Sequence, residues 1–276
     1  MAKQIVQCYF SILEYYVMAD NDTMKHIIDH YTAYHIKTRS KLYKVLKNEF
    51  SNLYDGFTQY VPDGETMEVP YIILNELKIR TCPYCNRNYT FAVHREKGRT
   101  RPELDHFYNK AHNPLLALTF YNLVPSCPTC NKLKLTNKIG VNPYFDGFTS
   151  KFIVQREGSN LPILAEQLKE NDHLLIGFDN PSKEESLNIE HLALEELYQM
   201  HKEEVKELVE KAHAYNNKHV KEALVNSFQG PANTPADVFE FVWGKNLETA
   251  RQINRPLSKL TKDILDQLEI KIIDEH

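Results

Sequence analysis

The chain has 276 residues, of which 42% are hydrophobic and 25% charged, and its formal net charge is −4. This composition is typical of a folded globular protein and argues against a disordered one. No apolar run approaches the roughly 20 residues that span a bilayer, which argues against a transmembrane protein. The first residues lack the pattern of a secretory signal, so we expect a cytoplasmic protein whose five cysteines are not a disulfide framework.

The charge is unevenly distributed along the chain. Residues 82–140 carry nine lysines and arginines against three acids, a net charge of +6. Residues 141–276 hold fifteen basic and twenty-four acidic residues, a net charge of −9. A basic island in an acidic chain indicates a nucleic-acid partner, because clustered cations attract a phosphate backbone. The charge by itself leaves DNA and RNA open as partners, since no residue pattern identifies a reader of the 2′-hydroxyl.

Residues 1–75 are expected to form an N-terminal helical region. Apolar residues recur at three-to-four spacing up to residue 50, which predicts three helices, the second capped by Asn21 or Asp22. Turn residues predict a loop over residues 51–69. Residues 70–79 form a short apolar element that is too short to be assigned as strand or helix.

Residues 76–156 are expected to form the core of the protein. Four of its segments have the composition of strands, and one begins as a helix does. We predict strands at residues 89–93, 103–108, 121–124 and 151–155, and a short helix at residues 131–138. The charged run at residues 94–101 suits an exposed connection.

Residues 157–276 are expected to form an acidic C-terminal helical region. Ser182 and Glu185 give a capping-box signal for a long helix that continues through Val209. Two further helices are expected around residues 238–243 and 256–273. The region carries no chemical motif, so a scaffold and a docking surface for a partner are equally open.

Four of the five cysteines form two Cys-x-x-Cys pairs, Cys82/Cys85 and Cys127/Cys130. Each short turn can supply two thiolate ligands, and four thiolates suit one tetrahedral Zn²⁺. We therefore predict a structural zinc site that draws together the two ends of the stretch between the pairs. The fifth cysteine, Cys8, lies in an apolar run and is expected to be a buried free thiol.

The residues around the second pair follow a recognisable order: Asp105-His106, Asn122-Leu123, and Cys127-Pro-Thr-Cys130-Asn131-x-x-Lys134. This order resembles the HNH endonuclease family over about residues 82–138. The resemblance implies an α+β fold with a zinc-braced ββα-metal core between helical flanks. It also implies metal-dependent hydrolysis of DNA phosphodiester bonds, with 5′-phosphate and 3′-hydroxyl products.

The resemblance further implies a role for each of four residues. His106 would be the general base, and Asp105 and Asn131 would bind a catalytic Mg²⁺ or Mn²⁺. Asn122 would fix the loop and the orientation of His106. Within the family, the chain is similar to the nuclease subunit of the bacterial Septu anti-phage system, so an ATPase partner subunit is expected.

The chemistry of these residues supports the same hypothesis. His106, with a reference pKa of about 6.5, can accept a proton from water near neutral pH. Asp105 and Asn131 offer the oxygen donors that Mg²⁺ prefers. Adjacent strand residues point to opposite faces, so Asp105 and His106 can act on one phosphate only at a bulge or a strand end.

Four basic side chains are candidates for contact with substrate. We expect Lys110 and Lys134 to clamp phosphate, and Arg87 and Lys132 to position the backbone.

The alternative is a zinc-stabilised nucleic-acid-binding or adaptor protein without catalysis, in which Asp105 and His106 are structural. His94 and His112 are rival candidates for the site, and both are expected at the surface.

Overall fold

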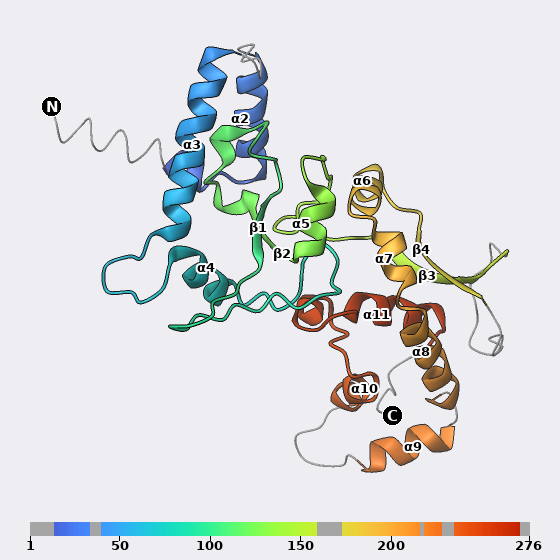
Figure 1. Ribbon diagram of the computed structural model, residues 1–276. Helices are drawn as coiled ribbons and strands as arrows, with labels where there is room; N and C mark the ends of the chain where they lie inside the picture. Colours follow the sequence, from blue (N-terminus) through green and yellow to red (C-terminus); the bar gives the residue numbers. More distant parts are fainter. Residues whose placement is uncertain (1–13, 34–39, 159–172, 216–217, 228–234, 271–276) are drawn as a thin grey trace. The chain divides into compact units, whose positions relative to one another are not determined.

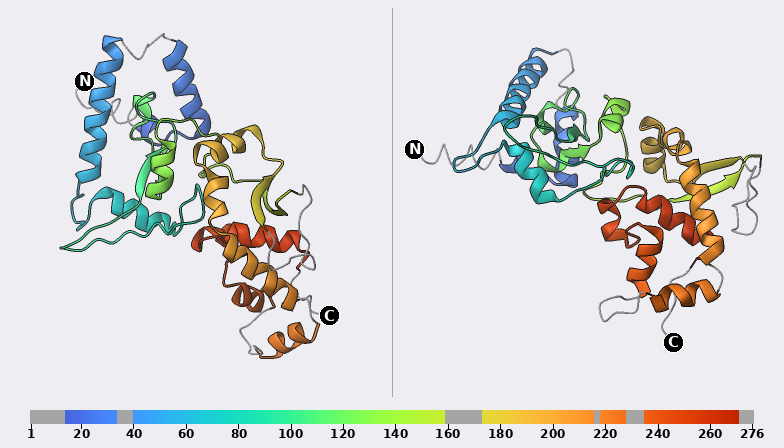
Figure 2. Two further views of the ribbon diagram at one scale, coloured as in Figure 1. Left: turned by 45° about the vertical axis from the view of Figure 1, so that its right-hand side comes forward. Right: turned by 60° about the horizontal axis from the view of Figure 1, so that its bottom comes forward.

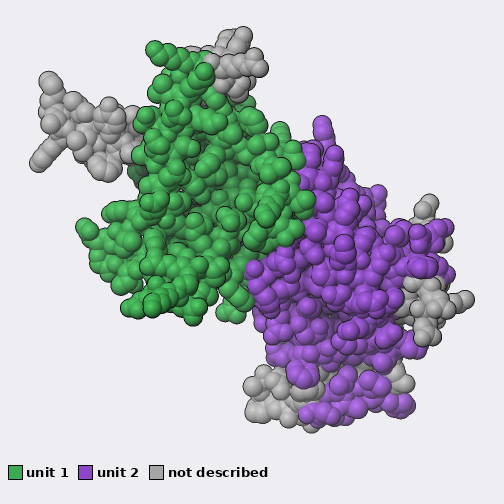
Figure 3. Space-filling view, in the orientation of Figure 1, with its two compact units in different colours: residues 1–84, 90–147 green, residues 85–89, 148–276 purple. Residues whose placement is uncertain are grey.

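The computed structural model describes residues 14–33, 40–158, 173–215, 218–227 and 235–270 (Figure 1). The protein is α+β, with many helices and two small antiparallel sheets. The chain divides into two compact units (Figure 3). Unit 1 comprises Met1–Tyr84 and Thr90–Gly147, and unit 2 comprises Cys85–Tyr89 and Phe148–His276. Across the described residues, no helix is long and apolar enough to cross a membrane.

Unit 1 contains the helices α2 (Asn21–Ala33), α3 (Lys41–Gln59) and α4 (Val69–Leu77). The predicted cap of the second helix is wrong by a residue, because Asp20 accepts the hydrogen bond from the Thr23 N–H (2.9 Å). The predicted first helix and Cys8 lie largely or wholly outside the described residues.

The predicted loop over residues 51–69 is half wrong, because α3 continues to Gln59. Tyr54 and Phe57 on this last part of α3 pack against a cluster of three buried leucines from α4 and the first sheet, which are Leu74, Leu104 and Leu123. Burial of two aromatic rings outweighs the roughly 1 kcal/mol that Gly56 costs inside a helix. Residues 70–79 likewise become mainly helical, as α4.

The first sheet pairs β1 (Glu103–His106) with β2 (Leu123–Ser126) in antiparallel register. The chain between them forms two 3-10 turns, η1 (Pro114–Leu116) and η2 (Phe120–Asn122), which lie beside α2 and α3 (Figures 1 and 2). The predicted strands at residues 103–108 and 121–124 are therefore present, although β1 ends two residues earlier and β2 lies two residues later than predicted. A predicted strand at residues 89–93 is not present, because only Val93 of that segment pairs, in an isolated bridge with Thr100.

Directly after β2, helix α5 (Pro128–Lys134) begins earlier than the predicted residue 131 and ends earlier than residue 138. Cys127 is its N-cap, and the Cys127 Sγ accepts a hydrogen bond from the Cys130 N–H. Leu135 adopts a positive φ of 48°, which ends the helix.

Unit 2 contains the second sheet, in which β3 (Lys151–Arg156) pairs with β4 (Leu174–Asp179) and places Val154 opposite Ile176. The outward backbone groups of both residues are bonded by glutamine side chains. Gln267 accepts from the Val154 N–H (2.8 Å) and donates to its carbonyl (3.0 Å). Gln199 bonds the N–H and the carbonyl of Ile176 in the same way.

The helices of unit 2 follow in chain order and are α6 (Lys183–His191), α7 (Leu194–Gln199), α8 (Lys202–Tyr215), α9 (Lys218–Ser227), α10 (Pro235–Trp243), the 3-10 helix η4 (Thr249–Asn254) and α11 (Ser258–Gln267). The single long helix predicted from Ser182 through Val209 is wrong, because it is interrupted twice. Ala193 takes a left-handed conformation with φ of 48°, and α7 ends at Gln199. The interruption turns Tyr198 onto the ring of Phe152, at a centroid distance of 4.3 Å.

The two units also divide the chain differently from the three predicted regions. The N-terminal helices pack with the cysteine-bearing stretch in unit 1 instead of forming a region of their own. Residues 151–156, predicted as the end of the core, belong to unit 2 because they pair with β4.

The capping box predicted at Ser182 and Glu185 is confirmed. The Glu185 carboxylate accepts hydrogen bonds from three backbone N–H groups, those of Ser182 (2.8 Å), Ser150 (2.9 Å) and Thr149 (2.5 Å). Burial acts to raise the pKa of Glu185, but the N–H groups of Ser150, Ser182 and Thr149 outweigh it and lower the pKa to about 2.

We expect Glu185→Gln to lower the free energy of unfolding of unit 2 by roughly 2–3 kcal/mol at pH 7, since charged acceptors make the stronger hydrogen bonds. Because the folded pKa lies below the unfolded one, this stabilisation is complete above about pH 4.5 and is lost as the pH falls toward 2. Urea unfolding of both proteins at pH 7 and pH 3 measures the difference. The exposed neighbour Glu184→Gln is the control, and an equal loss in both variants would contradict the assignment.

Candidate functional site

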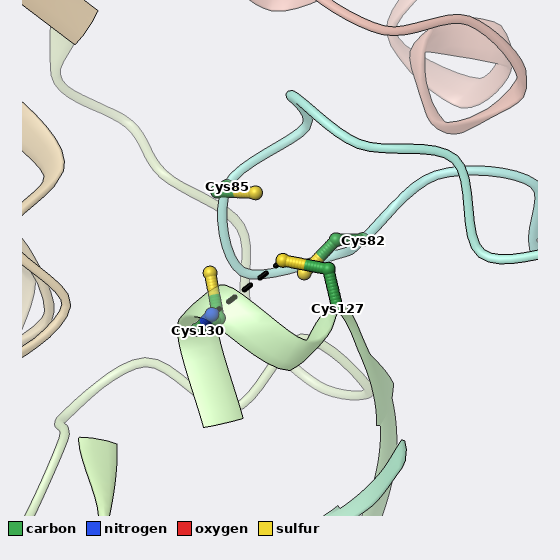
Figure 4. A group of neighbouring side chains, drawn as sticks. All are labelled: Cys82, Cys85, Cys127 and Cys130. Carbon is green, nitrogen blue, oxygen red and sulfur yellow. Dashed lines mark hydrogen bonds between the residues drawn. The ribbon is translucent and has the colours of Figure 1, made fainter. Parts of the chain in front are cut away.

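The four cysteines of the two predicted pairs come together. Figure 4 shows Cys82 and Cys85 on one loop, facing Cys127 and Cys130 at the start of α5. Their sulfur atoms all lie within 4.8 Å of one another, and the residues are between 0% and 3% exposed. Ligands at the Zn–S distance of about 2.3 Å around a tetrahedral ion are about 3.8 Å apart. The group therefore fits one metal ion such as zinc.

Asp105 on β1 is buried beside this group and is fully engaged. The Tyr84 hydroxyl donates to its Oδ2 (2.8 Å), and the Lys134 Nζ lies 3.1 Å from Oδ2 and 3.3 Å from Oδ1. Burial, followed by the charge of Asp105, raises the pKa of Tyr84 well above its ordinary value, so Tyr84 remains a donor. Asp105 thus joins β1 to the first cysteine loop and to α5.

Lys134 does not lie where a phosphate clamp is needed. Its side chain is 0% exposed, and its ammonium also donates to the His106 carbonyl (2.6 Å). The sequence prediction that Lys134 contacts substrate is therefore wrong. A lysine in the last turn of a short helix usually faces solvent, but α5 directs the Lys134 side chain toward β1.

His106, the last residue of β1, faces different neighbours. Its Nε2 lies 2.9 Å from the Ala117 carbonyl, and its ring centroid lies 4.8 Å from that of Tyr54 on α3. A carbonyl can only accept, so Nε2 carries the proton and Nδ1 of the neutral ring is an acceptor. No described residue bonds to Nδ1. Nδ1 is also not one of the fully buried side-chain atoms that lack a hydrogen-bond partner. Burial lowers the pKa of His106 to about 4, although the hydrogen bond that Nε2–H donates to the Ala117 carbonyl acts to raise it.

Asn122 holds the chain segment that supports His106. Its Oδ1 accepts from the Tyr108 N–H (2.7 Å), and its Nδ2 donates to the carbonyls of Tyr108 (3.1 Å) and Leu116 (2.8 Å). The side chain is completely buried. The Asn122 amide therefore bonds two parts of the connection after β1, at Tyr108 and at Leu116. Ala117, whose carbonyl bonds His106, is the residue after Leu116.

The side chains of Asp105 and His106 share no partner among the described residues, although the Lys134 ammonium that bonds the Asp105 carboxylate also bonds the His106 backbone carbonyl. Tyr84 and Lys134 contact Asp105, whereas Tyr54 contacts the His106 ring. β1 stays in regular register through His106, without a bulge, although the strand ends there. The expected convergence of carboxylate and imidazole on one point is therefore not made by these two side chains as they lie.

The remaining candidates lie in several places. Lys110 places its ammonium 4.3 Å from the ring centroid of Tyr54, the ring that also contacts His106. Lys132 is exposed on α5. Arg87 belongs to unit 2, where its Nε donates to the His201 Nε2 (2.9 Å).

The rival histidines differ from each other. His112 is exposed, as expected. His94 is only 18% exposed, because its Nε2 pairs with Glu68 at 3.0 Å.

The residues expected to bind a catalytic metal do not fit one as they lie. Asn131 is half-buried one helical turn before Lys134, so it is placed toward the same side of α5. Both oxygens of Asp105, however, are within 3.3 Å of the Lys134 ammonium, which a divalent ion would have to displace. Within the described part of the chain, the four cysteines are the only group of three or more His, Cys, Asp or Glu side chains close enough to share a metal.

Two residues of the site were missed from the sequence, Tyr54 and Tyr84. Tyr84 lies inside the first Cys-x-x-Cys pair, so its position in the metal loop was a signal for its placement. Tyr54 is about fifty residues away in sequence from His106, inside the segment predicted as a loop, and no local pattern connects it to the site.

No family model, curated protein or solved structure matches this chain.

If the four thiolates hold one zinc ion, Cys130→Ser should lose the metal and unfold the segment around it, because structural zinc contributes folding free energy directly. Metal analysis should find one zinc per chain in the wild type and much less than one in the variant. Cys8→Ser, which changes the fifth cysteine, should keep its zinc and its melting temperature. Equal zinc in wild type and Cys130→Ser would contradict the site.

Removal of the Lys134 ammonium should leave Asp105 buried without its counter-charge. We expect Lys134→Met to lower the free energy of unfolding by about 3–5 kcal/mol. The double variant Asp105→Asn/Lys134→Met should lose much less, because no buried charge remains. Lys132→Met, an exposed lysine on the same helix, should change stability by no more than about 0.5 kcal/mol. Chemical denaturation of the wild type and these three variants measures the losses, and a double variant that loses as much stability as Lys134→Met would show that the pair is not one unit.

Proposed function

We propose that this protein is an endonuclease of the HNH type that hydrolyses DNA phosphodiester bonds, with His106 as the general base. The order of a first cysteine pair, β1, β2 and a helix that starts at the second pair supports a zinc-braced ββα core. The basic charge of residues 82–140 supports a polyanionic substrate.

The observation that carries the proposal is the orientation of His106. Its Nε2–H is fixed on the Ala117 carbonyl, and Asn122 closes the connection that leads to Ala117. The Nδ1 lone pair is the part of the ring that no described residue uses. A base in this state is prepared to accept a proton without first losing one.

In the proposed reaction, the proton of an attacking water moves to His106 Nδ1 as the water oxygen forms a bond to phosphorus. The bond from phosphorus to the 3′-oxygen breaks, that oxygen takes a proton from solvent water, and His106 returns its proton to solvent, which leaves 5′-phosphate and 3′-hydroxyl ends. Lys110, on the ring of Tyr54 that also contacts His106, is the described cation best placed to attract the phosphate.

The family resemblance adds a catalytic Mg²⁺ or Mn²⁺ held by Asp105 and Asn131. As they lie, these residues do not fit such an ion, because Lys134 neutralises Asp105. Metal dependence and a role in anti-phage defence with an ATPase partner therefore rest on the resemblance alone.

A second candidate function is a zinc-stabilised nucleic-acid-binding or adaptor protein. The observation in its favour is the Asp105–Lys134–Tyr84 group, which is a complete, buried structural network. In this reading His106 is also structural, as a buried histidine with one hydrogen bond.

Cleavage of plasmid DNA, with and without Mg²⁺ or Mn²⁺, tests the proposal. We expect His106→Ala to slow cleavage by roughly 10²–10⁴-fold, the usual contribution of a general base. His112→Ala, which removes an exposed histidine from the same connection, should cleave like the wild type. Cleavage retained in His106→Ala would remove this residue from its role, and tight DNA binding without cleavage by the wild type would favour the second candidate.

The pH dependence gives an independent check. With a pKa of about 4, His106 stays unprotonated between pH 7 and 5.5, so its state should not reduce the cleavage rate over that range. A histidine with the reference pKa of about 6.5 would be about nine-tenths protonated at pH 5.5 and would cause a loss of several-fold. The ring proton shift of His106, followed by NMR against His106→Ala, reports the same titration without an activity measurement.

A further inference from the structure

A short hairpin (residues 91–101), closed by the isolated bridge between Val93 and Thr100 and called the ribbon below, leads directly into β1. Val93 and Thr100 exchange two backbone hydrogen bonds, of 2.8 Å and 3.0 Å, and Gly98 makes the turn with a φ of +78°. The ribbon lies beside α4 in Figure 1. It carries four arginines and lysines against one glutamate, a net charge of +3.

One face of the ribbon is fixed to unit 1. Ala92 packs against the cluster of Leu74, Leu104 and Leu123, and His94 lies edge-on to the ring of Tyr71 at 4.9 Å. Glu68, the residue before α4, accepts hydrogen bonds from both His94 and Arg99. The ribbon is therefore held at one orientation, and the groups on this face are already paired.

The other face is turned to solvent and combines apolar and basic side chains. Exposure alternates along the first arm of the ribbon, with residues 92 and 94 half-buried and Phe91 (54%), Val93 (45%) and Arg95 exposed. Lys97 stands at the tip, and the Arg95 guanidinium donates to the Gly98 carbonyl there (3.1 Å). Phe91 and Val93, which gave this segment the composition of a strand, therefore face solvent and do not enter a core.

We infer that this outer face is a contact surface for duplex DNA, with Arg95 and Lys97 on backbone phosphates and Phe91 and Val93 against base edges. The major groove of B-form DNA is wide enough for two antiparallel chain segments side by side, so it can admit this hairpin, and apolar side chains there can contact the thymine methyl group. The deep, narrow major groove of an RNA duplex excludes them. Lys97 is nine residues from His106, at most about 30 Å of extended chain, which keeps the contact within about one turn of a DNA helix from the proposed base.

This inference rests on the proposed function for the position of the cut, but its test measures binding. The full chain with His106→Ala is titrated into fluorescein-labelled 24-base-pair DNA, and into the RNA duplex of the same sequence, at several salt concentrations. Fluorescence anisotropy gives Kd and its salt dependence. We expect Arg95→Ala/Lys97→Ala to weaken DNA binding about ten- to hundredfold and to lower the slope of log K against log salt by about 2.

Phe91→Ser should weaken DNA binding without a change in that slope, and should reduce the preference for DNA over RNA. The control is Lys44→Ala/Lys47→Ala, which removes the same charge from exposed positions of α3. Zinc content and the circular dichroism spectrum establish that each variant is folded.

Equal losses in the ribbon and control pairs, or equal binding of DNA and RNA duplexes by the parent protein, would overturn the inference. Cleavage by the protein with His106 intact is measured separately. Normal cleavage and binding in the ribbon variants would overturn the ribbon assignment while the nuclease proposal stands. If the protein with His106 intact never cleaves DNA but the ribbon variants lose binding, the ribbon assignment stands and the nuclease proposal is overturned.

Discussion

The arrangement of unit 1 depends on how helix α5 is held at both ends. At its start, Cys127 caps the helix with its sulfur atom, and Cys130 adds a second thiolate to the group of four. At its end, Lys134 is buried against β1, where it bonds a carboxylate and a carbonyl. A helix of two turns has little stability by itself. Its position is therefore a consequence of these two attachments, and β1 and β2 take their place relative to the helix from them.

Because α5 is held in this way, Asp105 and His106 have different roles in unit 1. A carboxylate that is buried against an ammonium and a phenol is costly to disturb, so Asp105 serves first as an anchor between three elements. The ring of His106 makes one hydrogen bond and one aromatic contact, and no described residue bonds its Nδ1 atom. The anchor and the proposed base are adjacent in sequence, so rigidity at Asp105 fixes the strand end from which the imidazole extends.

The sequence was informative where a local pattern determines structure. The spacing of the four cysteines predicted their convergence, the strands around residues 105 and 123 follow from their composition, and the box at Ser182 and Glu185 from its own chemistry. It was misleading where distant contacts decide. α3 passes through Gly56 because residues on either side of it pack on leucines far along the chain.

The same limit applies to the candidate site. In unit 2, Ala193 interrupts a regular helical pattern with a left-handed conformation, and Tyr198 beyond it lies on the ring of Phe152. Lys134 was expected to clamp phosphate, but its partner is Asp105, which lies twenty-nine positions earlier in the sequence, beyond the reach of any helical periodicity. Tyr54 contacts His106 only through the fold of α3. Patterns within one element identified the residues of interest, but not which of them meet.

The glutamines that bond Val154 and Ile176 have a consequence for how unit 2 behaves toward other molecules. A sheet of two strands consists entirely of edge strands, and free backbone groups there are a template for pairing with another chain and for aggregation. Gln267 and Gln199 each present an amide that imitates a peptide group, so each strand is bonded at its midpoint on the side away from its partner. These two side chains therefore take the place of neighbouring strands at the middle of the sheet, so another chain cannot pair with the backbone of Val154 or Ile176.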